Sequence, residues 1–212
     1  MPRSLRVILI IDYQVGNLGS IANIVRKIGG GAPVVSADPA EIARASKLIL
    51  PGVGAFDHGA RRLREAGLER PLREAVLERK VPILGICLGM QLMTSGSEEG
   101  TETGLGWIGG HVVRFGSGIP HWSLRVPHMG WNTVTVRSAD PLFSEMYAEP
   151  RFYFVHSYHV LCSDQRLVTA TSHYGHEFVS AFRSGNIYGV QFHPEKSHKF
   201  GMRLLDNFLR HA

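Results

Sequence analysis

The chain has 212 residues, of which 44% are hydrophobic and 19% charged, with a net charge of +5. This composition supplies a buried core and carries too little charge for intrinsic disorder. No run approaches the roughly 20 apolar residues of a membrane-spanning helix, and the first residues lack the apolar centre of a secretory signal. Cys87 and Cys162 do not form the dense pattern of a disulfide scaffold. We therefore expect one soluble, cytoplasmic domain over residues 1–212, with reduced cysteines and no membrane contact.

The net positive charge does not indicate a nucleic-acid partner. The densest basic stretch lies between residues 61 and 80, but four glutamates are threaded through it at helical spacing. Mixed signs cancel the field that phosphate binding requires, and no aromatic residues interleave with the basic ones. We interpret this stretch as a solvated helix face.

Strand and helix patterns alternate through the first half of the chain. The continuous apolar run of residues 5–11 is typical of a strand buried on both faces, and a helical repeat follows at 18–28. The next expected elements are a strand at 34–36, a helix at 39–45, a strand at 47–50, helical stretches within 58–80 and a strand at 81–86. This alternation predicts an α/β fold with an open, largely parallel, flavodoxin-like sheet flanked by helices.

From about Trp107 the pattern changes to short strands. We expect them at 110–115, 133–136, 151–158, 168–174, 179–183 and 187–192. A final amphipathic helix carries on one face Phe200, Leu204, Leu205, Phe208 and Leu209. The C-terminal half therefore adds antiparallel strands to a mixed sheet, which this helix closes from one side.

A cysteine lies in the motif Gly85-Ile86-Cys87-Leu88-Gly89, between an expected buried strand and a short helical stretch at 90–94. This is the arrangement of a nucleophile elbow with Cys in place of Ser. The flanking glycines permit a tight turn, and the start of a helix stabilises a thiolate. The Leu88 amide would then point at a carbonyl oxygen under attack. The alternative is that Cys87, like Cys162, is a small buried hydrophobic residue.

A thiolate nucleophile needs a partner that accepts and donates protons, commonly an imidazole oriented by a carboxylate. His193 follows an expected strand, and Glu195 lies two positions further along. In an extended segment both side chains point the same way, so Glu195 can hold one ring nitrogen while the other faces Cys87. The alternative is a loop histidine followed by an acid that caps the last helix.

A third element, Pro51-Gly52-Val53-Gly54, also follows a buried strand. Its glycines allow a backbone N–H near Gly52 or Val53 to serve as a second oxyanion donor. Open α/β sheets gather their active sites at the carboxyl ends of the strands. The three strand-end motifs together therefore predict an active site.

These motifs resemble the class I, triad-type glutamine amidotransferases, and within them the family of glutaminase subunits of imidazole glycerol phosphate synthase. The resemblance covers nearly the whole chain, through the segments 11–13, 16–18, 51–56, 85–91, 126–132, 153–158 and 189–197. One departure is Gln14, where relatives commonly carry glycine. If that turn requires a positive φ, either Gln14 is strained or the loop has a different shape.

The resemblance implies a reaction, the hydrolysis of glutamine to glutamate and ammonia. Cys87 would be the nucleophile, His193 the general base and acid, and Glu195 the residue that orients His193. The amides of Val53 and Leu88 would form the oxyanion hole, the Val53 amide turning inward only on activation. Glutamine would bind near Gly52, Gln91, His156, Ser157 and Tyr158. No metal and no organic cofactor are expected.

The resemblance also implies a partner, a (β/α)8-barrel cyclase subunit in a heterodimer. It would receive ammonia through a protected channel and make imidazole glycerol phosphate and AICAR in histidine biosynthesis. The segment with His128, Met129 and Trp131 resembles the partner-facing surface of the family. The alternative is that Met129 and Trp131 are core residues.

Three other interpretations remain open at this point. A triad glutaminase of the anthranilate, pyridoxal phosphate or guanylate pathways would share Cys87, His193 and Glu195. A non-catalytic interaction protein would keep the fold without the activity. A cysteine peptidase or other hydrolase on a similar fold would turn over peptides or esters and ignore glutamine.

Overall fold

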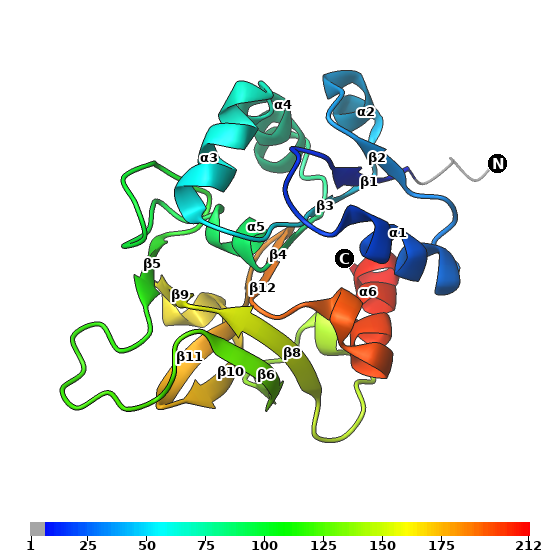
Figure 1. Cartoon of the computed structure of the whole chain (residues 1–212). Helices are drawn as coiled ribbons and strands as arrows, with labels where there is room; N and C mark the ends of the chain where they lie inside the picture. The colour runs from blue at the N-terminus through cyan, green and yellow to red at the C-terminus, as the bar shows by residue number, and fades with distance from the viewer. Residues whose placement is uncertain (1–6) are drawn as a thin grey trace.

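The computed structural model describes residues 7–212, which form twelve strands and six α-helices (Figure 1). The strands are β1 (Ile8–Ile11), β2 (Val34–Ser36), β3 (Lys47–Leu50), β4 (Ile83–Ile86), β5 (Gly110–Arg114), β6 (His128–Thr133), β7 (Thr135–Val136), β8 (Arg151–His156), β9 (Tyr158–Cys162), β10 (Val168–Tyr174), β11 (His176–Ser184) and β12 (Ile187–Val190). The helices are α1 (Leu18–Lys27), α2 (Pro39–Arg44), α3 (Phe56–Glu65), α4 (Glu69–Arg73), α5 (Leu88–Gln91) and α6 (His198–His211).

One sheet of eight strands runs through the molecule in the order β2-β1-β3-β4-β12-β11-β10-β7. The strands from β2 to β12 pair in parallel, and β11, β10 and β7 continue the sheet antiparallel. Two small antiparallel sheets, β5 with β9 and β6 with β8, lie beside it. The parallel part has the strand order of a flavodoxin-like sheet. The predicted mixed, largely parallel α/β fold is confirmed.

The alternation of side chains along the central strands builds two cores. Leu9, Ile11 and Leu48 belong to the core that also contains residues of α2, α3 and α4. Their neighbours Ile8, Ile10 and Ile49 belong to the other core, with residues of α1 and α6. Successive strand residues point to opposite faces, and both faces of these strands are buried in a core. Every position is therefore apolar, which explains the continuous hydrophobic runs in the sequence. The helices therefore cover both faces of the parallel sheet (Figure 1).

Several predicted elements have different bounds in the structure. Residues 5 and 6 of the first expected strand lie outside the described residues, and β1 begins at Ile8. The expected strand at 151–158 is two strands, because the chain turns at Ser157 from β8 into β9. The expected strand at 133–136 is also two strands: β6 begins earlier, at His128, and pairs with β8, and β7 follows at Thr135. The single-domain organisation stays a prediction.

The charged stretch at 61–80 forms α3, α4 and a π-helical turn, Glu74–Glu78. Its arginines pair with the threaded glutamates, as Arg62 does with Glu65 at 2.9 Å and Arg70 with Glu74 at 2.7 Å. The interpretation as a solvated helix face is confirmed. Within residues 7–212, no helix is both long and apolar enough to cross a membrane.

The turns after β3 and β4 pack against each other without space for a side chain. A Cβ on Gly89 would lie 1.8 Å from the carbonyl oxygen of Leu50. A Cβ on Gly52 would lie 2.8 Å from the Gly89 nitrogen and 2.8 Å from the Leu88 Cβ. The glycines of both motifs therefore let two backbone segments approach closely at the carboxyl edge of the sheet.

We predict that Gly89→Ala destabilises the fold, because its methyl group displaces the backbone at the end of β3. The expected loss is about 1–3 kcal/mol in the free energy of unfolding. The matched control is Gly19→Ala in α1, where an added Cβ meets nothing within 4 Å. The control is expected to be stabilising by up to about 1 kcal/mol. Denaturant unfolding measures both, and equal stabilities for the two variants would contradict the prediction.

Candidate active site

Cys87 lies in a strained turn between β4 and α5. Its φ of 53° and ψ of −110° are rare for a residue with a side chain. The turn is held by a hydrogen bond from the Cys87 N–H to the carbonyl oxygen of Val190 (2.8 Å) and by one from the Gln91 N–H to the carbonyl oxygen of Cys87 (3.1 Å). This is the backbone of a nucleophile elbow. The helix begins at Leu88, two residues earlier than expected.

His193 and Glu195 form a buried pair beside this turn. His193 Nδ1 lies 2.8 Å from Glu195 Oε1, and their side chains are 1% and 2% exposed. The contact was predicted for an extended segment, but Pro194–Lys196 is a 3-10 turn that brings the two groups together. Ser197 Oγ donates to the carbonyl oxygen of His193 at 2.6 Å and so fixes the turn from the other side.

The protonation of His193 is governed by its two neighbours. Burial opposes protonation of the ring, but Cys87 and Glu195 outweigh burial and raise the pKa of His193 above its ordinary value. Nδ1 is engaged by Glu195, whereas Nε2 has no hydrogen-bond partner among the described residues. Cys87 lies close enough to the ring to favour its protonated form. The ring can carry a proton and has one nitrogen free to deliver it.

The loop after β3 packs against the turn that holds Cys87. Tyr13 is buried (1% exposed), and its hydroxyl donates to the carbonyl oxygen of Pro51 at 2.6 Å. Burial, together with Cys87, raises the pKa of Tyr13, so this hydroxyl stays a donor. Gly54 has a φ of +97°, which turns the chain directly after Val53. The loop packs on Leu88, and Val53 lines the same cavity as Cys87.

The turn that follows β1 confirms the strain expected at Gln14. Gln14 has a φ of 66°, a left-handed conformation that favours glycine. Its amide N–H donates to Asp12 Oδ1 at 3.0 Å, and its side-chain oxygen accepts from the Arg62 guanidinium. These contacts stabilise a residue that sterics disfavour.

One open cavity of about 580 Å³ brings most of the expected site residues together. Its lining residues are Val53, Gly54, Ala55, Cys87, Leu88, Gln91, Glu99, Pro127, Val155, His156, Ser157, Tyr158, His193 and Lys196. Glu195 and Gly52 are not among the lining residues: Glu195 contacts His193, and Gly52 packs against Leu88 and Gly89. The sequence interpretation missed Glu99 and Lys196, which carry charge to the cavity. Glu99 had no motif around it, and it reaches the cavity because its Oε2 accepts from the Phe56 N–H at 2.8 Å.

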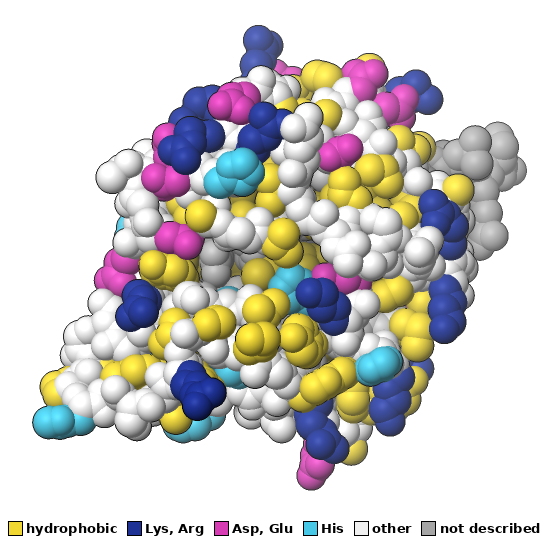
Figure 2. Space-filling model, in the orientation of Figure 1, with side chains coloured by type: hydrophobic (Ala, Val, Ile, Leu, Met, Phe, Trp, Pro, Cys, Tyr) yellow, Lys and Arg dark blue, Asp and Glu magenta, His cyan; other side chains and the backbone are white. Residues whose placement is uncertain are grey.

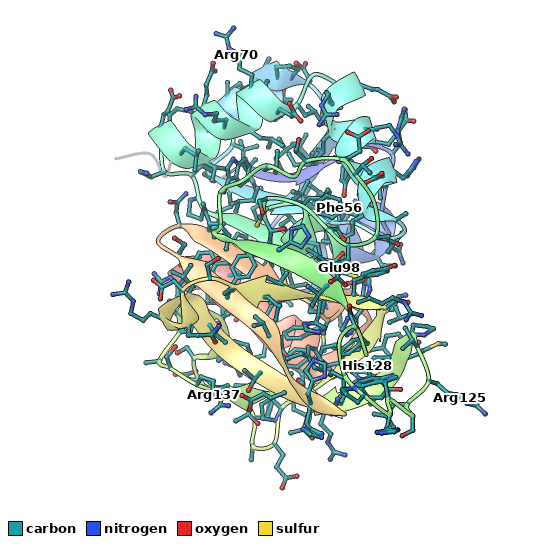
Figure 3. The ribbon with its side chains drawn as sticks, turned by 90° about the vertical axis from the view of Figure 1, so that its left-hand side faces the viewer. Phe56, Arg70, Glu98, Arg125, His128 and Arg137 are labelled. Atoms are coloured by element: carbon teal, nitrogen blue, oxygen red, sulfur yellow. The ribbon has the colours of Figure 1, made fainter. Side chains whose placement is uncertain are left out.

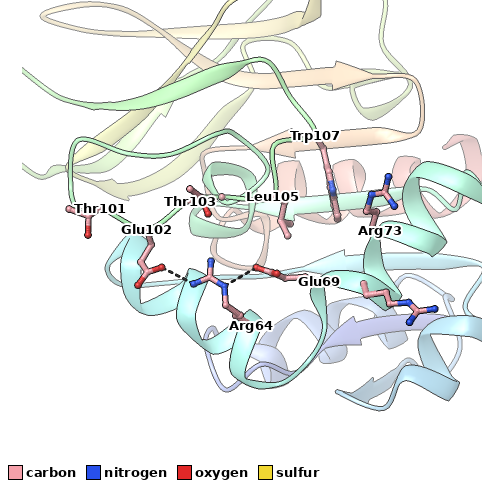
Figure 4. A pocket seen from close by; sticks show the side chains of 10 residues that line it. Arg64, Glu69, Arg73, Thr101, Glu102, Thr103, Leu105 and Trp107 are labelled. Atoms are coloured by element: carbon pink, nitrogen blue, oxygen red, sulfur yellow. Dashed lines mark hydrogen bonds and ion pairs between the residues drawn. The ribbon is translucent and has the colours of Figure 1, made fainter.

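A larger cavity of about 730 Å³ lies between α4 and the loop at 101–107 (Figure 4). It contains none of the expected site residues. Its three arginines are already paired: Arg64 with Glu102 (2.7 Å) and Glu69 (3.4 Å), Arg70 with Glu74 (2.7 Å) and Arg73 with Glu78 (3.5 Å). Within residues 7–212, no group of three or more His, Cys, Asp or Glu side chains is arranged to hold a metal ion. The smaller cavity is therefore the candidate active site.

Of the three residues expected to face a partner, Met129 and Trp131 are exposed and His128 is buried. Met129 and Trp131 are 62% and 48% exposed, so the alternative that they are core residues is wrong. They add to the hydrophobic side chains that gather on the face built from β6 and β8 (Figure 2). His128 is only 4% exposed and points into the half of the molecule made by the antiparallel strands (Figure 3). Its side chain therefore packs beneath the surface that Met129 and Trp131 form.

The pair of His193 and Glu195 makes a testable contribution to stability. A histidine whose pKa is raised on folding stabilises the fold fully below the ordinary pKa of about 6.5, and this contribution is lost as the pH rises through the raised value. We predict that Glu195→Gln, which keeps an acceptor but removes the charge, costs about 1–3 kcal/mol in the free energy of unfolding at about pH 6. The cost falls in alkaline solution, where the ring is neutral. Denaturant unfolding across this pH range measures it, and a cost independent of pH would contradict the prediction.

Comparisons with known proteins agree with this geometry. Residues 9–212 match the family described as "Glutamine amidotransferase class-I". "Imidazole glycerol phosphate synthase subunit HisH 2" of Methanococcus maripaludis is 50% identical over 206 residues, which are 97% of this chain and 100% of that relative. The relative with the same name in Pseudomonas aeruginosa is 45% identical, over 96% of this chain and 98% of its own.

Solved structures with lower identity share the fold. The crystal structure of a putative GMP synthase protein from Thermoplasma acidophilum superposes with a TM-score of 0.70 at 20% identity, covering 96% of this chain and 92% of that chain. A glutamine amidotransferase from Thermotoga maritima superposes with a TM-score of 0.64 at 22% identity, over 90% of this chain and 76% of its own. The family match and the relatives at 45–50% identity show the family of the chain as well as its fold. The chain belongs to the class-I glutamine amidotransferase family.

Proposed function

We propose that this chain is a glutaminase subunit that hydrolyses the side-chain amide of glutamine to glutamate and ammonia. The observation that carries the proposal is the strained Cys87 in one open cavity with His193, whose ring is held by a buried carboxylate at 2.8 Å. The relatives named HisH support the assignment to imidazole glycerol phosphate synthase and histidine biosynthesis. A glutaminase of another synthase is the remaining alternative.

The reaction follows from the arrangement of these groups. His193 takes the proton of the Cys87 thiol, the sulfur attacks the amide carbon of glutamine, and the electron pair of the C=O bond moves to the oxygen. The C–N bond then breaks while His193 gives its proton to the departing nitrogen, which leaves as ammonia. Water attacks the thioester, His193 accepts a proton from it, and glutamate leaves as the Cys87 sulfur is regenerated. Glu195 keeps the ring oriented through both steps.

The oxyanion formed in each step needs two donors. We assign this role to the backbone amides of Leu88 and Val53, which lie on the turns that follow β4 and β3. Preorganised amides at such a position stabilise the transition state by several kcal/mol. By analogy with the family, the Val53 amide turns inward on activation, and basal activity is low.

Glutamine binding requires groups for the rest of the substrate. We assign it to Gly52, Gln91, His156, Ser157 and Tyr158. To these we add Glu99, which lines the cavity and is the acidic side chain that can pair with the α-ammonium group of glutamine.

The proposal includes a partner. Ammonia released into water at neutral pH becomes ammonium, which is not nucleophilic, so a synthase must transfer it through a protected channel. We propose a heterodimer with a (β/α)8-barrel cyclase subunit in the cytoplasm. Met129 and Trp131 supply exposed apolar surface for this interface, whereas His128 supports it from beneath.

The first test measures ammonia release from glutamine, with and without the cyclase and its ribonucleotide ligand. Wild type is expected to turn over with the liganded cyclase and Cys87→Ala to be inactive, because the nucleophile is missing. Cys162→Ala is the matched control and is expected to keep its activity, since Cys162 is buried in the core. Turnover in Cys87→Ala would contradict the mechanism. Strong turnover of wild type that the cyclase leaves unchanged would contradict the assigned partner.

The role of Glu99 is tested separately by steady-state kinetics. We predict that Glu99→Gln raises KM for glutamine about tenfold with little change in kcat, because a charge-assisted hydrogen bond is lost equally from the ground and transition states. Glu98→Gln is the matched control, since Glu98 accepts from the Arg114 N–H at 2.8 Å outside the cavity. An unchanged KM in Glu99→Gln would remove Glu99 from the binding site.

A further inference from the structure

A chain of hydrogen bonds between buried amides ends at the sulfur of Cys87. Gln191 follows β12 and is 0% exposed, and its Nε2 lies 3.7 Å from Cys87 Sγ. Its Oε1 lies 3.1 Å from Gln91 Nε2. The same nitrogen of Gln91 lies 3.1 Å from the carbonyl oxygen of Tyr158. The mechanism above assigns no role to Gln191.

The chain continues from Tyr158 through two buried histidines to strand β6. His156 Nδ1 lies 2.8 Å from the carbonyl oxygen of Tyr158, and its Nε2 lies 3.0 Å from His128 Nδ1. His128 Nε2 lies 3.2 Å from Asn132 Nδ2, which also donates to the carbonyl oxygen of His173 at 2.9 Å. His128 and His156 are 4% and 6% exposed. The chain thus spans from the nucleophile to the strand that carries the exposed Met129 and Trp131.

The Tyr158 carbonyl fixes the tautomers of both histidines. A carbonyl oxygen only accepts, so His156 must carry its proton on Nδ1. Its Nε2 then accepts from His128 Nδ1, and His128 Nε2 accepts from Asn132. Both rings must be neutral for this order to hold. Burial favours this state, because it lowers the pKa of His128 to about 4 and that of His156 well below its usual value.

The same carbonyl fixes the orientation of both glutamine amides. Gln91 must present its NH₂ group to Tyr158, and the same group donates to Gln191 Oε1. Gln191 therefore presents its own NH₂ group to the Cys87 sulfur. The reversed orientation of Gln191 would place two NH₂ groups against each other.

We propose that Gln191 is a positioning residue for the nucleophile: its carboxamide, held in one orientation by Gln91 and the Tyr158 carbonyl, donates a hydrogen bond to Cys87 Sγ. A donor stabilises the thiolate more than the neutral thiol, because hydrogen bonds to ionised groups are stronger. The role in catalysis rests on the proposed function, but the hydrogen bond to the sulfur does not.

The test is the rate at which iodoacetamide alkylates Cys87 in Gln191→Met, which keeps a similar side-chain volume but has no donor. We expect alkylation to slow about tenfold, which corresponds to about 1.4 kcal/mol for one hydrogen bond to a charged group. With glutamine and partner, kcat falls by a similar factor while KM changes less than about twofold. Asn207→Leu is the matched control, because Asn207 is a buried amide (2% exposed) in α6 that bonds to Leu142 and Ser144. Cys162 reports unfolding, since it reacts only when the core opens.

An unchanged alkylation rate in Gln191→Met overturns the proposal, as does an equal slowing in Asn207→Leu. A second measurement needs no variant. Nitrogen-15 NMR of the wild-type imidazoles is expected to show His128 and His156 neutral at neutral pH, each with its proton on Nδ1. A proton on Nε2 of either ring overturns the chain. Both measurements proceed without glutamine or partner, so they stand even if the chain has no glutaminase activity.

Discussion

Close packing of two backbone turns is the constraint on which this site depends. The turn after β4 holds Cys87 at a positive φ, and the turn after β3 presses against it where Gly52 and Gly89 leave no room for side chains. A strained conformation persists only when its surroundings over-determine it. Here the neighbouring strands β3, β4 and β12 hold the turn in this conformation, because their ends lie side by side in the sheet. The nucleophile, the proposed oxyanion donors and the histidine are thereby brought to one edge.

The second feature is the compensation of buried charge. A protonated imidazole in a buried site costs several kcal/mol of desolvation unless a partner offsets it. Glu195 offsets this cost on one side of His193, and Cys87 does so on the other. His128 and His156 avoid this desolvation cost because they carry no charge. Burial lowers the pKa of both rings, and each neutral ring has a nitrogen that can accept a hydrogen bond. Burial thus keeps His128 and His156 neutral, whereas Cys87 and Glu195 favour the protonated form of His193.

The sequence predicted those strands whose bounds follow from the local pattern of residues. The strands at 34–36, 47–50 and 168–174 have the expected bounds. The strand at 47–50, for example, is a short apolar run that ends at Pro51. The break at Ser157 was not predictable, since β8 and β9 form one continuous run and separate only because they pair with different strands, β6 and β5. The contact of His193 with Glu195 was predicted from spacing, although a 3-10 turn rather than an extended segment produces it. Glu99 and the orientation of Gln191 depend on segments far apart in sequence, so no local pattern indicated them.

The central claim is that Cys87 forms a covalent γ-glutamyl thioester during turnover. The most direct measurement mixes wild-type protein with glutamine and the liganded cyclase, quenches the reaction in acid and analyses the cysteine peptides by mass spectrometry. The account predicts one γ-glutamyl group on the peptide that contains Cys87 and none on the peptide that contains Cys162. Ammonia release at full rate with both cysteine peptides unmodified, or with the adduct on Cys162, would contradict it.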